Sequence, residues 1–183
     1  MAAAHVLAQA LFKEGKWVQA FPHFGVERRG APVAAFVRFD ETPIELRCHI
    51  YAPDYVIILD PTLAGSPAIV KGLKKNGGVL VNSPRILDDL SLPPEARLAV
   101  IDAGSIAVKY GLGTPLSPIV NTAILGAFAR FSQIVSLEAV SEAVVEIIRR
   151  NADANVAAVK ESYQSVLLPE MIEKKRNRDE KDL

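Results

Sequence analysis

Three short apolar runs in the middle of the chain constrain its fold more than any other feature. They cover residues 55–59, 79–82 and 98–102. Continuous apolar runs of this kind are typical of strands that are buried on both faces of a parallel sheet. Residues 66–75 and 105–110, which lie between or after these runs, have helix-like patterns. Strands that alternate with helices predict an α/β fold in three layers, with a mainly parallel sheet and helices on both faces.

The first fifty residues predict one helix and then three strands. Residues 2–14 carry apolar side chains at three- and four-residue spacing, which indicates a helix. Residues 17–21 follow as a short strand. Residues 33–39 and 44–50 are also strand-like, and the turn residues 40–43 separate them. We therefore expect these last two strands to pair as a hairpin, which adds an antiparallel part to the sheet.

The C-terminal third predicts three helices, over residues 118–131, 137–149 and 153–166. Gly126 lies inside the first of them, where glycine costs about 1 kcal/mol relative to alanine. We interpret it as the site of a close contact with another helix. Residues 169–183 carry charges of both signs, which favours a frayed, solvated end.

Length and charge narrow the class of protein. A chain of 183 residues is most simply one domain, here residues 1–168, followed by a charged C-terminal tail over residues 169–183. Its 21 Lys and Arg residues balance its 21 Asp and Glu residues, which argues against a nucleic-acid partner held by general basicity. No apolar run approaches the roughly 20 residues needed to cross a membrane. The first residues lack the pattern of a secretory signal. We therefore expect a cytoplasmic protein with no membrane partner.

Cysteine and histidine content limits the chemistry that this chain can do alone. Cys48 is the single cysteine, so an intrachain disulfide is impossible and the four thiolates of an iron–sulfur cluster are lacking. We interpret Cys48 as a small strand residue. His5, His23 and His49 are scattered without partners at metal-ligand spacing, so we predict no metal site. His23 and Glu27 share a compact segment but bring no nucleophile, and we predict no catalytic residue and no autonomous active site.

The run FPHFGVERRGAP, residues 21–32, contains more chemistry than a plain turn needs. Its glycines allow close backbone approach, and its prolines restrict the backbone. Its adjacent arginines offer planar charged groups that suit carboxylates or phosphates. We interpret the run as a binding or assembly loop, and the alternative is a structural salt bridge between the arginines and the neighbouring glutamate. The candidate residues are Gly25, Glu27, Arg28, Arg29 and Gly30.

The longer run FPHFGVERRGAPVAAFVRF resembles the FP-x-FG-x-ERRGAPV-x-AF-x-R segment of a known family. That family comprises the gamma subunits of pyruvate and related 2-oxoacid:ferredoxin oxidoreductases. Residues 57–63 (IILDPTL) and 121–128 (NTAILGAF) also match it, in the same order, and the similarity runs from about residue 2 to residue 163. The resemblance implies a subunit of pyruvate synthase, an enzyme of anaerobic metabolism. The reaction converts pyruvate, coenzyme A and oxidised ferredoxin to acetyl-coenzyme A, carbon dioxide and reduced ferredoxin.

The resemblance also implies cofactors and partners. Complexes of this family use thiamine diphosphate, magnesium and iron–sulfur clusters. Since this chain lacks both the cysteines and a G-D-G…N thiamine-metal motif, we expect it to bind none of these cofactors alone. They belong instead to alpha, beta and ferredoxin-like delta subunits. The gamma subunit is then expected to support assembly and the coenzyme A side of the active site.

Individual residues acquire expected roles from the same resemblance. Arg28 and Arg29 are expected to contact a phosphate of coenzyme A or carboxylates of a partner subunit. Asn121 and Thr122 lie near a predicted helix start, where an N-terminal cap is the first explanation, and the family implies a role toward a ligand or an interface. Asp60 follows a predicted strand, where it caps the next turn or binds a polar ligand, because ligands gather at the carboxyl ends of such strands.

Two questions stay open at this point. In the family, a strand and a G-x-G-G-Q-G loop precede the first helix, and both are absent before residue 2. We expect either a sequence that starts late or a protein without this element, and an exposed edge on a central strand. The substrate is also open: the ERRGAP run favours pyruvate or a branched-chain 2-ketoacid over 2-oxoglutarate. A stand-alone module that binds coenzyme A or a nucleotide is the alternative of another class.

Overall fold

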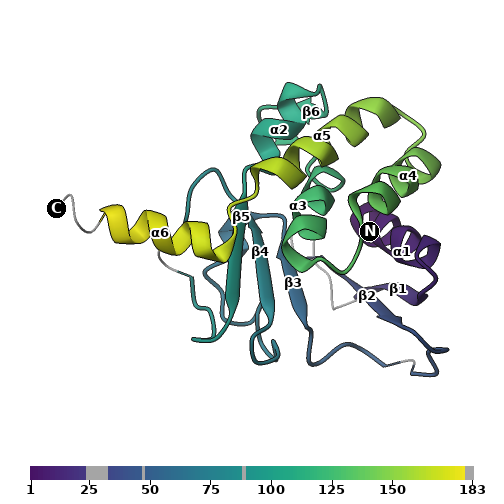
Figure 1. Cartoon of the computed structure of the whole chain (residues 1–183), viewed down its shortest axis with the longest axis horizontal. Helices are drawn as coiled ribbons and strands as arrows, with labels where there is room; N and C mark the ends of the chain where they lie inside the picture. The colour runs from purple at the N-terminus through teal and green to yellow at the C-terminus, as the bar shows by residue number, and fades with distance from the viewer. Residues whose placement is uncertain (24–32, 47, 88–89, 180–183) are drawn as a thin grey trace.

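The computed structural model describes residues 1–23, 33–46, 48–87 and 90–179, which form an α/β structure (Figure 1). The helices are α1 (Ala2–Lys13), η1 (Pro61–Leu63, 3-10), α2 (Ala103–Lys109), α3 (Ala123–Ser132), α4 (Leu137–Ile147), α5 (Ala152–Ser165) and α6 (Pro169–Asp179). The strands are β1 (Trp17–His23), β2 (Ala34–Asp40), β3 (Tyr55–Ile58), β4 (Gly78–Asn82), β5 (Arg97–Ile101), β6 (Gly113–Thr114) and β7 (Ser117–Pro118). The three apolar runs of the sequence are therefore strands, as predicted.

The central sheet is parallel and has the order β3-β4-β5, with Leu80 beside Ala99. Both of its faces are buried. Leu80 and Ala99 belong to a core shared with α1, α3, α4 and α5, whereas Val79 and Val81 belong to a second core that includes Ile172 of α6. Successive residues of a strand point to opposite faces, so a strand covered on both sides has to be apolar throughout. The predicted fold class is confirmed. Among the described residues, no strand pairs with the outer edge of β3.

The layer above the sheet contains α3 and α5, which approach each other at Gly126 (Figure 1). A methyl group at this position would lie 1.8 Å from the carbonyl oxygen of Val159 in α5. Only hydrogen therefore fits between the two backbones, and the close helix contact inferred from the sequence is confirmed. Neither backbone can move away freely, because both helices also pack against the core.

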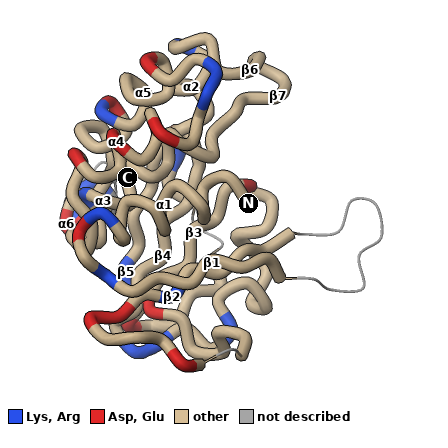
Figure 2. The backbone as a smooth tube through the Cα atoms, turned by 90° about the vertical axis from the view of Figure 1, so that its right-hand side faces the viewer, with Lys and Arg blue, Asp and Glu red and all other residues tan. Residues whose placement is uncertain are grey.

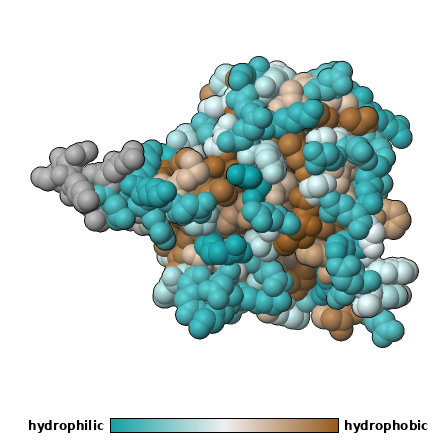
Figure 3. Space-filling view, viewed as in Figure 1, coloured by the Kyte–Doolittle hydropathy of each residue, from teal (hydrophilic) through white to brown (hydrophobic). Residues whose placement is uncertain are grey.

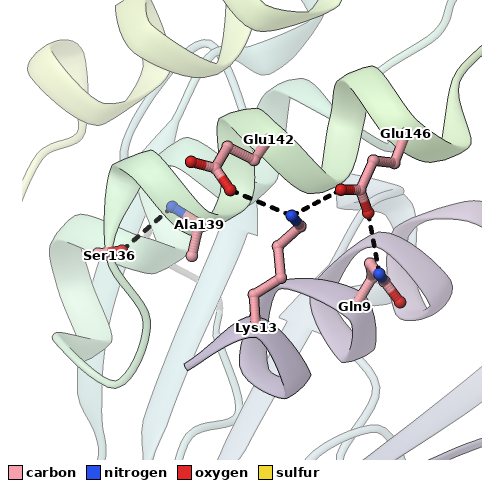
Figure 4. Close-up of polar contacts among 6 residues, drawn as sticks. All are labelled: Gln9, Lys13, Ser136, Ala139, Glu142 and Glu146. Atoms are coloured by element: carbon pink, nitrogen blue, oxygen red, sulfur yellow. Dashed lines mark hydrogen bonds and ion pairs between the residues drawn. The ribbon is translucent and has the colours of Figure 1, made fainter. Parts of the chain in front are cut away.

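Polar contacts join α1 to α4 at the edge of the same layer (Figure 4). Lys13 Nζ lies 3.1 Å from Glu142 Oε2 and 2.6 Å from Glu146 Oε1. Gln9 Nε2 donates a hydrogen bond to Glu146 at 2.9 Å. The Ser136 hydroxyl caps α4 by accepting a hydrogen bond from a backbone N–H of its first turn, at 3.1 Å. The contacts of Lys13 and Gln9 lie at the rim of the apolar interface between α1 and α4, and they fix how the two helices lie against each other.

The antiparallel part of the structure is a two-stranded ribbon of β1 and β2, and this corrects the expected hairpin. Residues 34–40 pair with β1 instead of with residues 44–50. Of that second stretch, the described residues 44–46 and 48–50 form no strand. Its carbonyls accept hydrogen bonds from side chains of the ribbon, as described below, and this replaces the backbone ladder. Strand-like composition alone could not show whether the carbonyls of this stretch bond to the backbone of another strand or to side chains.

Residues 66–75 form successive turns, so the helix predicted there is wrong. Gly72 has a φ of +81°, and a Cβ on it would lie 2.1 Å from the carbonyl oxygen of Tyr51. The backbone N–H of Lys74 donates to the carbonyl of Pro53 at 3.0 Å instead of to a helical partner. The stretch thus packs against the 51–54 backbone, which a regular helix could not do.

Two predicted boundaries near the C-terminal half also change. Residues 118–122 precede α3, because Ser117 and Pro118 form the short strand β7 and pair with β6. Residues 169–179 form α6, so the expected frayed end is wrong for them. Ile172 of α6 is buried, and Leu167 just before the helix exchanges backbone hydrogen bonds with Val100. The division at residue 168 into a domain and a tail stays a prediction.

Charge and hydropathy follow this architecture. Arg38 and Asp40 lie in β2 and Arg97 begins β5, but no lysine, arginine, aspartate or glutamate lies along β3 or β4 (Figure 2). On the side shown in Figure 1, hydrophobic residues reach the surface in a band across the middle of the molecule (Figure 3). Within the described parts of the chain, the helices are too short or too polar to cross a membrane.

Candidate functional site

Five of the seven predicted site residues lie between β1 and β2. Gly25, Glu27, Arg28, Arg29 and Gly30 fall outside the described residues. The places where the chain enters and leaves this segment are described: His23 ends β1, and it pairs with Ala34 at the start of β2. The site can therefore be built up from the ribbon that carries the segment.

The ribbon has two faces with different neighbours. Val18 and Val37 lie on the face that packs against the core beside α1. Because side chains alternate along a strand, the neighbours of Val18 in β1 and of Val37 in β2 point to the opposite face. That opposite face carries Trp17, Gln19, Phe21, His23, Phe36 and Arg38. Its contacts are with residues 44–51, which follow β2 in the chain. The ribbon is thus enclosed between a helix and an irregular segment.

Side-chain hydrogen bonds hold this irregular segment on the ribbon. The Arg38 guanidinium donates to the carbonyl of Leu46 at 3.0 Å and to the carbonyl of Cys48 at 2.9 Å. Gln19 Nε2 donates to the carbonyl of Ile44 at 3.2 Å, and its Oε1 accepts from Arg38 at 3.2 Å. The planar guanidinium can reach both carbonyls at once, which a lysine ammonium would do less well. Arg38 therefore positions Leu46 and Cys48 against the ribbon.

Aromatic and imidazole rings gather at the end of the ribbon nearest residues 24–32. The ring centroids of Phe21 and Phe36 are 5.5 Å apart, and those of His23 and Phe36 are also 5.5 Å apart. His49 brings its ring to 5.1 Å from His23 and to 6.4 Å from Tyr51. These pairs are tilted or edge-to-face rather than stacked. The phenylalanines are half-buried, whereas His23, His49 and Tyr51 are exposed, Tyr51 by 75%. We call these three exposed rings the ring strip.

Among the described residues, the charges near the ribbon are partly neutralised by local contacts. The Arg38 guanidinium lies 5.8 Å from the Phe21 ring centroid, within reach of a cation–π interaction. At the end of β2, Asp40 accepts a hydrogen bond from the backbone N–H of Thr42 at 3.2 Å. This bond lowers the pKa of the Asp40 carboxyl below its ordinary value. Lys16 pairs with Glu41 in the same turn.

Polar side chains at the carboxyl ends of the parallel strands are engaged in local hydrogen bonds. Asp60 accepts a hydrogen bond from the backbone N–H of Thr62 at 2.9 Å and caps η1, so its predicted capping role is confirmed. Asp102 caps α2 in the same way. The amide of Asn82 donates to the carbonyl of Leu59 at 2.9 Å. Polar groups here are used to end strands and start helices.

The remaining two predicted residues lie at the start of α3, in the helical body. Thr122 occupies the N-cap position, but its buried hydroxyl donates to Asn155 of α5 instead of capping α3. The Asn155 amide in turn donates to the carbonyl of Asn151 at 2.8 Å. Asn121 has a buried Oδ1 without a hydrogen-bond partner in the described part of the chain. Thr122 thus joins two helices, and the capping explanation is wrong for its side chain.

No group of three His, Cys, Asp or Glu side chains in the described ranges is placed to hold a metal ion. Cys48 is exposed and lies outside any strand, which corrects its expected place, and its Sγ is 3.9 Å from an Arg38 nitrogen. One exposed thiol does not fit an iron–sulfur cluster, which needs four thiolates. The described residues therefore do not fit the metal cofactors implied by the resemblance.

Residues 1–165 match the family described as pyruvate ferredoxin/flavodoxin oxidoreductase. The chain belongs to this family. It is 48% identical over 166 residues to the pyruvate synthase subunit PorC of Methanocaldococcus jannaschii, with 90% of this chain and 89% of that protein covered. It is 45% identical over 174 residues to the pyruvate/ketoisovalerate oxidoreductases common subunit gamma of Thermococcus kodakarensis, with 92% and 91% covered.

Solved structures of pyruvate ferredoxin/flavodoxin oxidoreductase subunits share the fold. The crystal structure of pyruvate oxidoreductase subunit PORC from Thermotoga maritima matches with a TM-score of 0.75 and 34% identity, over 91% of this chain and 89% of that one. A 2-oxoglutarate:ferredoxin oxidoreductase from Magnetococcus marinus matches with a TM-score of 0.64 but only 16% identity, which shows the fold alone. The chain is thus a gamma-type subunit of a pyruvate or 2-oxoacid ferredoxin oxidoreductase, and the resemblance found in the sequence is confirmed.

Sequence reasoning missed most of the described part of this site. It grouped His23 with Glu27, treated His49 only as one of three scattered histidines, and assigned no role to Tyr51 or Arg38. His23 and His49 are 26 positions apart, and residues 44–50 were expected to be a strand paired with residues 33–39. The one available signal was the density of aromatic and imidazole residues on both sides of the ERRGAP run.

Proposed function

We propose that this subunit supports assembly of its complex and forms the coenzyme A side of the active site. The reaction is the oxidation of pyruvate with coenzyme A to acetyl-coenzyme A and carbon dioxide, with ferredoxin as electron acceptor. One observation carries the proposal. Residues 24–32, which include the ERRGAP run, join the two strands of a ribbon that packs against α1 on one face and is hydrogen-bonded to Ile44, Leu46 and Cys48 on the other.

The chemistry of the segment suits the phosphates of coenzyme A. Arg28 and Arg29 are permanently charged and can form two parallel hydrogen bonds to a phosphate or carboxylate. Gly25 and Gly30 allow the backbone to approach a ligand closely. Since the whole chain has no net charge, attraction of an anion has to be local.

The remaining chemistry belongs to partners. We assign thiamine diphosphate, magnesium and the iron–sulfur clusters to alpha, beta and ferredoxin-like delta subunits, because this chain has one cysteine and no described metal-ligand group. Thiamine diphosphate supplies carbanion stabilisation, and the clusters carry electrons. The residues of this chain would bind coenzyme A and contact the partner subunits. We place the complex in the cytoplasm.

The 2-oxoacid is the least constrained part of the proposal. The relatives from Thermococcus and Pyrococcus are named as common gamma subunits of pyruvate and ketoisovalerate oxidoreductases. Those names support an alternative in which this chain also serves an enzyme for branched-chain 2-ketoacids. The likeness to a 2-oxoglutarate enzyme, at 16% identity, concerns the fold alone and does not favour 2-oxoglutarate as the substrate.

A first experiment tests the assembly. The tagged chain is captured from its native cells without oxygen, and its partners are identified by mass spectrometry. We expect a thiamine-binding subunit and a cysteine-rich ferredoxin-like subunit. Recovery of the chain alone, under conditions that preserve related complexes, would contradict the proposal and favour a stand-alone coenzyme A or nucleotide-binding module.

A second experiment tests the coenzyme A role in the assembled complex. Replacing Arg28 and Arg29 together by glutamine is expected to raise the KM for coenzyme A at least about tenfold, since charge-assisted hydrogen bonds contribute roughly 1.5–3 kcal/mol each, with the KM for pyruvate unchanged. Arg149 and Arg150, an exposed adjacent pair after α4, provide the matched control. An equal effect of both double variants, or none of either, would contradict a specific phosphate site.

A further inference from the structure

The ring strip of His23, His49 and Tyr51 places three exposed rings next to one another on the surface. All three rings are exposed, and each combines a flat face with a polar atom at its edge. The contacts within the strip are edge-to-face, with interplanar angles of 85° for His23 with His49 and 76° for His49 with Tyr51. None of the three therefore has a ring stacked flat upon it in the described structure. Flat ring faces in water suit a planar heteroaromatic ligand.

The strip is held in place from below. Phe36 packs edge-on against His23 at 5.5 Å and against His49 at 6.0 Å, and Phe21 lies 6.4 Å from His49. Arg38 holds the backbone next to His49 through the carbonyl of Cys48. Rings that are already ordered lose little entropy when a ligand binds, so such a surface is preorganised.

The charge around the strip excludes some ligand classes. In the described ranges, Arg38 is the charged side chain that contacts this group of rings, through Phe21. Among the described residues, no carboxylate contacts the strip, and this favours a neutral ligand over a cation such as a quaternary ammonium. A neutral base is the better fit, and stacking on aromatic side chains tolerates any base because each has a flat face.

We infer that the ring strip binds the adenine ring of coenzyme A. The inference rests on the proposed function, and it adds the part of the substrate that the subunit recognises. His23 is the last residue before the segment to which we assign the phosphates. Adenine and the phosphates belong to the same end of coenzyme A, so neighbouring parts of the subunit would bind neighbouring parts of one substrate.

The experiment compares coenzyme A with 4′-phosphopantetheine, which ends in the same thiol but has no adenine. Both are assayed with the assembled complex, in which His49→Ala and Tyr51→Ala are made singly. Each variant is expected to raise the KM for coenzyme A at least about fivefold, since base stacking is worth roughly 1–3 kcal/mol. The KM for 4′-phosphopantetheine and the kcat are expected to stay unchanged. Tyr51→Phe keeps a ring face and should restore the KM.

A direct measurement uses 1,N6-etheno-coenzyme A, whose fluorescence is quenched when its base stacks. Quenching by the native complex is expected, and it should be lost in Tyr51→Ala. His5→Ala provides the control, because His5 is an exposed histidine in a groove on α1 that lies outside the ring strip.

The outcomes separate the inference from the proposed function. If the arginine variants raise the KM for coenzyme A and the ring variants do not, the proposed function stands and the ring strip is not the adenine site. If neither set changes that KM, both ideas fall. If the ring variants weaken assembly of the complex while leaving the KM unchanged, the strip is a subunit contact and the inference is overturned.

Discussion

The ribbon and the helical body of this subunit are stabilised by different kinds of contact. In the body, α3 and α5 meet with backbone against backbone at Gly126, and Thr122 is fully enclosed between them. Beside the ribbon, the carbonyls of Ile44, Leu46 and Cys48 accept hydrogen bonds from Arg38 and Gln19, and the rings beyond them are exposed. The body therefore depends on burial and close packing, whereas the ribbon depends on a few side chains.

This difference has a functional consequence. Close packing resists small changes in geometry, since a core has little free volume to absorb them. A segment held by a few exposed hydrogen bonds opens more readily, and binding surfaces are commonly drawn from such parts of a protein. The order of the region that we assign to coenzyme A therefore depends on the hydrogen bonds from Arg38 and Gln19 more than on close packing. Four predictions test this comparison.

The largest effect is expected in the body, from Gly126→Ala. The added methyl group would overlap the Val159 carbonyl, and overpacking of this kind costs about 3 kcal/mol or more. Thermal unfolding of the purified subunit or its complex provides the measurement. The matched control is Gly104→Ala in α2, where the nearest atoms to a Cβ lie at 3.5 and 3.7 Å. That change should be neutral or slightly stabilising. Equal stability of the two variants would show that α3 and α5 are not in close contact.

Thr122→Val should destabilise the body by about 1–3 kcal/mol, because it leaves the buried Asn155 oxygen without its donor. Thr122→Ser keeps the hydroxyl and should retain most of the stability. Chemical denaturation of the two variants provides the comparison. A valine variant as stable as the native protein would indicate that the Thr122–Asn155 contact has no net value.

Arg38→Met should affect the ribbon more than the body. It removes two hydrogen bonds to backbone carbonyls, with an expected loss of about 1 kcal/mol. Hydrogen exchange followed by mass spectrometry should show faster exchange in residues 44–51 and little change in α3 and α5. Arg149→Met is the control on an exposed site. Uniformly faster exchange throughout the chain would contradict the separation of the two regions.

The smallest effect is expected at the α1–α4 contacts. The hydrogen bond from Lys13 and then that from Gln9 lower the pKa of Glu146 below 4.5, and Glu146 and then Glu142 raise the pKa of Lys13 above 10.5. A lowered carboxyl pKa gives stability that is present above the unfolded value and is lost as the pH falls through the folded value. A raised amine pKa gives stability that is lost as the pH rises through its folded value.

Glu146→Gln should therefore flatten the acid side of a plot of melting temperature against pH, by a small amount that salt reduces further. Glu173→Gln, on the exposed side of α6, is the control. The same change in both variants would mean that the Lys13 contacts do not couple folding to pH.

Local sequence patterns correctly predicted those helices and strands whose conformation does not depend on contacts with distant residues. Residues 2–13 and 152–165 are helices, and the three apolar runs are strands, because hydrophobic periodicity already shows which faces are buried. The ERRGAP, IILDPTL and NTAILGAF motifs identified the family, because a motif depends only on the order of residues along the chain. Residues 44–50 and 66–75 were assigned wrongly, because their backbones bond to distant groups, namely Arg38 and Pro53.

The sequence by itself determined the α/β class, the family and the segment that carries the arginines. Only the tertiary structure decided what lies beside that segment. His49 and Tyr51 reach His23 because residues 44–51 fold back over the ribbon, and they do so because Arg38 and Gln19 replace a strand as hydrogen-bond partners. Contacts of this kind join residues far apart in the chain through side chains, and no repeating pattern along the sequence records them.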